Sequence, residues 1–74
     1  MNAPLRHAQL RLDPLLVFEA RAEARAILWA EGEMDLHEAV NILHYAARRA
    51  GLIDQLGQDA VQRILADAFA KVRS

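Results

Sequence analysis

The sequence predicts an all-α fold class from three observations: its composition, its helix start and stop signals, and the spacing of its apolar residues. The 74-residue chain is rich in alanine, leucine and arginine, has few β-branched residues and lacks threonine, a composition typical of helical proteins. We expect one helical domain over residues 13–74, resembling a three-helix bundle with a short helical turn between its second and third helices. A flexible tail is predicted for residues 1–12, which show no clear apolar period.

The first predicted helix runs from Pro14 to Glu31 and organises the rest of the chain. Asp13 is a good N-cap residue, proline suits the first helical position, and Gly32 is a typical helix stop. At about 100° per residue, apolar side chains fall on two nearly opposite faces of this helix. One face comprises Leu16, Val17, Ala20, Ala24, Ile27 and Leu28. The other comprises Leu15, Phe18, Ala22, Ala26 and Trp29.

A helix with two apolar faces is either covered on both sides by its own chain or shared with a second chain. The other two predicted helices could cover both faces in a monomer, and that alternative stays open. Self-association is favoured because a domain of about 60 residues has a core of marginal size, and the chain has no cysteine to form a disulfide. We therefore predict a homo-oligomer, with a dimer favoured. The residues predicted for self-association are Leu15, Phe18, Ala22 and Trp29.

The second predicted helix runs from Leu36 to Ala50, after an acidic cap at Asp35 and before a glycine stop at Gly51. Its apolar face comprises Leu36, Ala39, Val40, Leu43, Ala46, Ala47 and Ala50, with Ile42 at the margin. A short apolar segment follows, in which Leu52, Ile53 and Leu56 are expected to close one end of the core. The third helix is predicted from Asp59 to Val72. Its apolar face comprises Val61, Ile64, Leu65, Ala68, Phe69 and Val72.

The polar side of the second helix is a possible surface for a protein partner. It carries His37, Asn41, His44, Tyr45 and Arg48. Aromatic, amide and arginine side chains together are a mixture that interfaces favour, although an ordinary solvated helix face is the alternative. The two histidines are about 10 Å apart along the helix axis, too far for a typical helical zinc pair. We therefore predict no metal site and no cofactor.

Catalysis is not expected from this sequence. Cysteine and threonine are absent, the one serine is Ser74 at the end of the sequence, and the one lysine is Lys71 on a predicted polar face. These residue types supply most protein nucleophiles. The sequence therefore predicts a non-enzymatic protein with no catalytic residues.

Charge and hydropathy argue against nucleic-acid and membrane partners. The net charge is −1 and the pI is about 6.3, so no overall positive field attracts nucleic acid or anionic lipid. No apolar run approaches the roughly 20 residues of a membrane span. The N-terminus lacks the apolar core of a signal peptide, so the cytoplasm is the expected location.

A small DNA-binding transcriptional regulator with a divergent helix-turn-helix is the alternative function. The segment from Ala47 to Gly51 ends one helix at a glycine before another helix begins. In a helix-turn-helix, however, the turn has only three or four residues, and here residues 52–57 intervene. Asp59 at the start of the next helix would face phosphate where a basic residue is wanted.

Two segments, VFEARAEARAILW and GQDAVQRILADAF, resemble those of short, uncharacterised Ala- and Arg-rich bacterial proteins of phage-like or mobile-element genes. This resemblance spans most of the region from Asp13 to Phe69. It implies a helical fold and a bacterial source, and it supplies no activity and no site residues. We therefore expect a small helical interaction module that acts as an adaptor, a regulator or an inhibitor.

Overall fold

The structure is a computed structural model that describes residues 13–73. In that range the chain forms helices and no strand, so the predicted all-α class is confirmed. The helices are α2 (Pro14–Ala30), α3 (Leu36–Arg49), α4 (Leu52–Leu56) and α5 (Gln58–Arg73). The flexible tail predicted for residues 1–12 lies outside the described residues.

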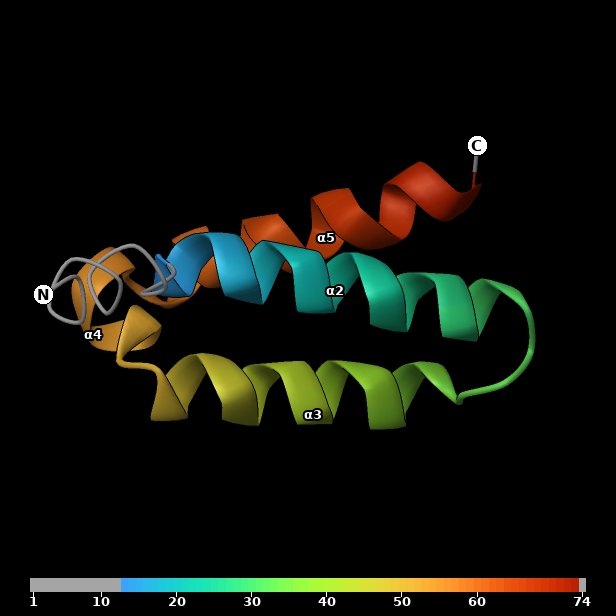
Figure 1. Cartoon of the computed structure of the whole chain (residues 1–74), viewed down its shortest axis with the longest axis horizontal. Helices are drawn as coiled ribbons and strands as arrows, with labels where there is room; N and C mark the ends of the chain where they lie inside the picture. The colour runs from blue at the N-terminus through green and yellow to red at the C-terminus, as the bar shows by residue number, and fades with distance from the viewer. Residues whose placement is uncertain (1–12, 74) are drawn as a thin grey trace, which may run out of the picture.

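The three long helices lie roughly along one direction, and α2 contacts both of the others (Figure 1). A short loop over residues 31–35 joins α2 to α3, which runs antiparallel to it. At the opposite end, the short helix α4 connects α3 to α5, and α5 then returns alongside α2 in the same direction. The core lies where α2 meets α3 and α5.

Local signals in the sequence define the helix starts. The Asp13 carboxylate accepts a hydrogen bond of 2.9 Å from the backbone N–H of Leu15, and the Asp35 carboxylate accepts one of 3.0 Å from the backbone N–H of His37. Each aspartate thereby satisfies a backbone donor that has no partner within the helix. Both predicted N-caps are confirmed.

Gly51 allows the sharp change of direction between α3 and α4. Its φ is 77°, in the left-handed region that side chains with a β-carbon avoid. Its backbone N–H donates to the carbonyl of Arg48 at 3.1 Å, which closes the last turn of α3. Because α3 stops there, Leu52 of α4 turns inward and is 1% exposed.

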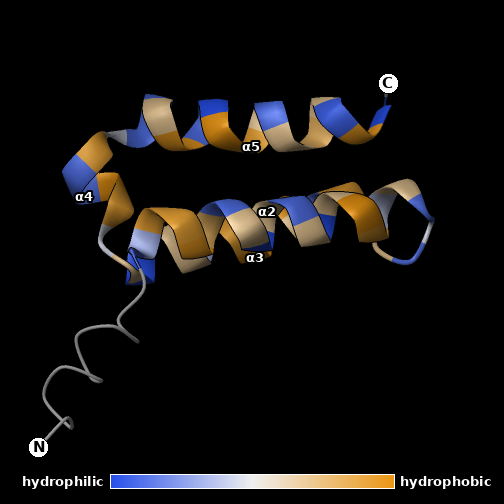
Figure 2. Cartoon of the chain, turned by 45° about the horizontal axis from the view of Figure 1, so that its top comes forward, coloured by the Kyte–Doolittle hydropathy of each residue, from blue (hydrophilic) through white to orange (hydrophobic). Residues whose placement is uncertain are grey.

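Small side chains make up much of the core. In Figure 2, hydrophobic residues recur between hydrophilic ones along the helices, as expected for amphipathic helices. The buried residues are Phe18, Ala22, Ala26, Ala39, Leu43, Ala47, Leu52, Val61, Leu65, Ala68 and Phe69. The alanines let the helix backbones approach closely, and the larger side chains fill the space between them. The Trp29 and Phe69 rings join α2 to α5, with centroids 5.4 Å apart and planes tilted by 49°.

The apolar faces predicted for the second and third helices supply the core of α3 and α5. Three predicted core residues, Leu36, Ala50 and Leu56, are exposed instead. Leu36 is 44% exposed and Leu56 is 41% exposed. Leu36 is the first residue of α3 and Leu56 the last of α4, so each lies where the packed part of its helix ends.

The face of α2 predicted for self-association is instead its inner face. Phe18 is 2% exposed and Ala22 is 0% exposed, and both belong to the core of the same chain. Leu15 and Trp29 pack against that core. This face packs toward both α3 and α5, which contact α2, and the Trp29 ring contacts Phe69 of α5. In the monomer Phe18 and Ala22 are therefore buried within one chain and do not form an exposed surface for a second copy.

Candidate functional site

The outer face of α2 carries an apolar strip that residues 13–73 leave uncovered. Leu16 is 61% exposed and Ile27 is 48% exposed, and Ala20 and Ala24 between them are also exposed. We call these four residues the α2 stripe. Single exposed apolar residues are common on monomers, but a continuous apolar strip is typical of an interaction surface. The apolar spacing of the sequence predicts this face, whereas the residues predicted for self-association lie on the opposite one.

Charges of opposite sign lie on the two edges of the α2 stripe. On the edge that faces α5, Glu19 and Glu23 lie close to Asp67 and Lys71 of that helix. Glu23 accepts an ion-pair contact of 3.0 Å from the Lys71 ammonium group, and both side chains are largely exposed. On the edge that faces α3, Arg21 lies beside the stripe. The stripe therefore has an acidic edge and a basic edge.

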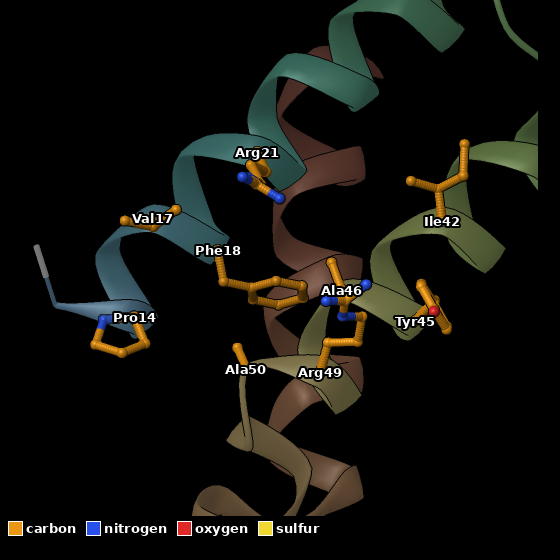
Figure 3. A pocket seen from close by; sticks show the side chains of 9 residues that line it. All are labelled: Pro14, Val17, Phe18, Arg21, Ile42, Tyr45, Ala46, Arg49 and Ala50. Carbon is orange, nitrogen blue, oxygen red and sulfur yellow. The ribbon is translucent and has the colours of Figure 1, made fainter.

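A groove with a volume of about 510 Å³ lies between α2 and α3 (Figure 3), within the range of many ligand sites. We call it the α2–α3 groove. It is lined by Pro14, Val17, Phe18, Arg21, Ile42, Tyr45, Ala46, Arg49 and Ala50. Figure 3 shows the Phe18 ring extending from α2 toward Ala46 on α3. The groove therefore has an apolar floor shared by both helices.

The charged side chains of the α2–α3 groove are both positive. Arg21 comes from α2 and Arg49 from α3, and none of the described residues that line the groove is acidic. The guanidinium carbon of Arg49 lies 5.8 Å from the centre of the Tyr45 ring, a cation–π distance. This contact holds Arg49 beside the groove. Two guanidinium groups above an apolar floor suit a ligand with carboxylates and an apolar side.

The partner surface predicted on α3 lies next to this groove. Asn41, His44, Tyr45 and Arg48 line a shallow hollow together with Val40. His37, the remaining predicted residue, is exposed but is not among the residues that line the hollow. Tyr45 lines both the hollow and the groove.

Arg21 and Arg49 are not among the site residues that the sequence predicts. Each lies on the edge of its own helix. The angular position of a residue on one helix shows that such an edge is polar but does not show which helix packs beside it. Their proximity depends on the antiparallel packing of α2 against α3, which that angular position does not contain. The available signal was the spacing of Arg21 and Arg25, which are four residues apart and therefore share one edge of the helix.

Several features are absent from the part of the chain that the structure describes. Among residues 13–73 no polar or charged side chain is buried, and no group of three potential metal ligands is found. No helix in this part of the chain has the length and apolarity to cross a membrane. The segment between α3 and α5 contains α4, so its spacing differs from that of a helix-turn-helix.

Comparisons with known proteins provide no relative for this chain. No family model, no curated protein and no solved structure matches it. The resemblance to phage-like bacterial proteins stays a prediction.

Proposed function

We propose that this protein is a non-enzymatic helical interaction module that self-associates through the α2 stripe and acts as an adaptor, a regulator or an inhibitor. The exposure of Leu16 and Ile27 on one continuous apolar strip supports this proposal most directly. Covering such a strip is favourable by about 25 cal/mol for each Å² of apolar surface removed from water. Association would also compensate for the small core of a short domain.

The charged edges favour one arrangement of the two copies. In a two-fold dimer with parallel α2 helices, the acidic edge of one copy faces the basic edge of the other. In a two-fold dimer with antiparallel α2 helices, like edges face each other, so Glu23 meets Glu23 and Arg21 meets Arg21. Opposite charges attract and like charges repel across such a contact. We therefore propose a parallel pair of α2 helices.

Replacing Leu16 with glutamate tests the self-association. The carboxylate would be buried without a partner in each copy, so the dimer dissociation constant should rise by about tenfold or more. Light scattering across a concentration series measures this change, and circular dichroism checks that the variant keeps its helix content. Gln62→Glu adds the same charge on the exposed face of α5 and should leave the mass unchanged. A wild-type chain that stays monomeric at its highest soluble concentration would contradict self-association.

Disulfide crosslinking tests the parallel arrangement, because the chain contains no cysteine of its own. In a parallel dimer every stripe residue lies opposite its own copy, so Leu16→Cys alone and Ile27→Cys alone should each form crosslinked dimers. These positions are about 16 Å apart along the helix. An antiparallel dimer would instead crosslink only when the two variants are mixed. Gln62→Cys on α5 serves as the control for random collision and should not crosslink.

A further inference from the structure

We propose that the α2–α3 groove binds an acidic amphipathic helix of a partner protein. The proposal rests on the shape of the groove, on its apolar floor and on the sign of its charges. It adds a partner site to the proposed self-association and does not depend on it.

The shape of the groove favours a helix as its occupant. The groove lies between two antiparallel helices. Its lining residues include Pro14 and Ala50, and also Ile42, which lies more than two turns away from Ala50 along α3, so the groove extends along the helices. A third helix laid along such a groove packs its apolar side chains between the two that form it. Ile42 is 36% exposed and Val17 is half-buried, so both present apolar surface that an added helix would cover.

The charges select an acidic occupant. Arg21 and Arg49 extend from the two walls, and Arg48 lies just beyond Tyr45 in the neighbouring hollow. The acidic residues Glu19 and Glu23 of α2 lie on the opposite edge, close to α5. Guanidinium groups bind carboxylates through two parallel hydrogen bonds. A helix with leucine-like residues on one face and glutamate or aspartate beside them would therefore fit the floor and both walls.

The acidic-helix site and the self-association surface can be separated by mutation. Arg21 and Val17 lie beside both surfaces, so they are poor test positions. Ile42 and Arg49 line the groove from α3 and are not part of the α2 stripe. Variants at these two residues should change partner binding and leave the solution mass unchanged.

Two labelled synthetic peptides provide the probes. Each is an amphipathic helix of about 20 residues with leucine on one face; one carries glutamate beside the leucines and the other carries lysine. Fluorescence anisotropy should show binding of the glutamate peptide at least about tenfold tighter than the lysine peptide. Arg49→Glu should weaken glutamate-peptide binding by about tenfold, and Ile42→Glu by a similar factor. Both peptides are tested on the full chain.

Arg63→Glu is the matched control, because Arg63 is an exposed arginine on α5 and its reversal changes the net charge equally. It should leave peptide binding unchanged, and the Leu16→Glu chain should still bind the glutamate peptide. Equal losses for Arg49→Glu and Arg63→Glu would overturn the site, since only net charge would then matter. The proposal also fails if Arg49→Glu lowers the solution mass instead, which would mark a second copy as the occupant. It fails likewise if duplex DNA competes the peptide away and itself loses affinity in Arg49→Glu.

Discussion

Replacing Phe18 with alanine is expected to lower the free energy of unfolding by about 3–5 kcal/mol. Phe18 is 2% exposed and belongs to the core, and its ring also forms part of the floor of the α2–α3 groove. The substitution removes a large apolar side chain and leaves a cavity that the packed helices close only partly. A domain of this length has a total stability of about 3–9 kcal/mol, so the substitution removes a large fraction of the stability of the fold.

Leu16→Ala is the matched control for this substitution, because Leu16 lies on the same helix but is 61% exposed. Its effect on the stability of the monomer should stay within about 0.5 kcal/mol. Urea denaturation followed by circular dichroism measures both variants, at a protein concentration low enough to keep the chain monomeric. Equal losses from the two substitutions would show that both faces of α2 are buried within one chain.

Replacing Ala22 with leucine is expected to cost about 2–3 kcal/mol of stability. Ala22 is 0% exposed on the inner face of α2, which packs against α3 and α5. A leucine there has no space unless the helices separate or neighbouring side chains leave their preferred rotamers. The midpoint of thermal or urea unfolding should therefore fall. The same fall is expected at protein concentrations low enough to keep the chain monomeric.

The Ala22→Leu result distinguishes two positions for Ala22: the core of one chain, or the interface between two chains that the sequence predicts. If Ala22 met a second chain, the leucine would change the solution mass and leave the monomer stable. Ala20→Leu makes the same change on the exposed face and is expected to leave the stability of the monomer nearly unchanged. A stable Ala22→Leu monomer with an unchanged solution mass would instead show that the core has unfilled space beside this residue.

The sequence predicted the helices well because their boundaries depend on neighbouring residues. Asp13 and Asp35 accept hydrogen bonds from backbone groups two residues later, and Gly51 adopts the positive φ that its lack of a side chain allows. These effects act within one turn of the chain. The apolar periods of α3 and α5 likewise predicted their buried faces, because each of these helices has one apolar face.

The orientation of α2 could not be predicted in the same way. Its two faces are both apolar, and the helical period alone gives no reason for α3 and α5 to choose the face of Phe18 over that of Leu16. One available signal was size, since Phe18 and Trp29, the aromatic residues of this helix, lie on the same face and offer more area to bury. The α2–α3 groove could not be predicted either, because Arg21 and Arg49 are far apart in sequence and line one groove only through helix packing.

The alanines of the core restrict which amino-acid substitutions this fold tolerates. Four of these alanines are 0% exposed: Ala22, Ala26, Ala39 and Ala47. A larger side chain at any of these positions therefore has no space. Replacement by the smaller glycine is also disfavoured, since glycine in a helix interior lowers the stability by about 1 kcal/mol relative to alanine. Each position therefore has a single well-tolerated size, whereas sites filled by leucine or phenylalanine accept several apolar residues. Divergent versions of this protein should thus differ more at their large core residues than at their small ones.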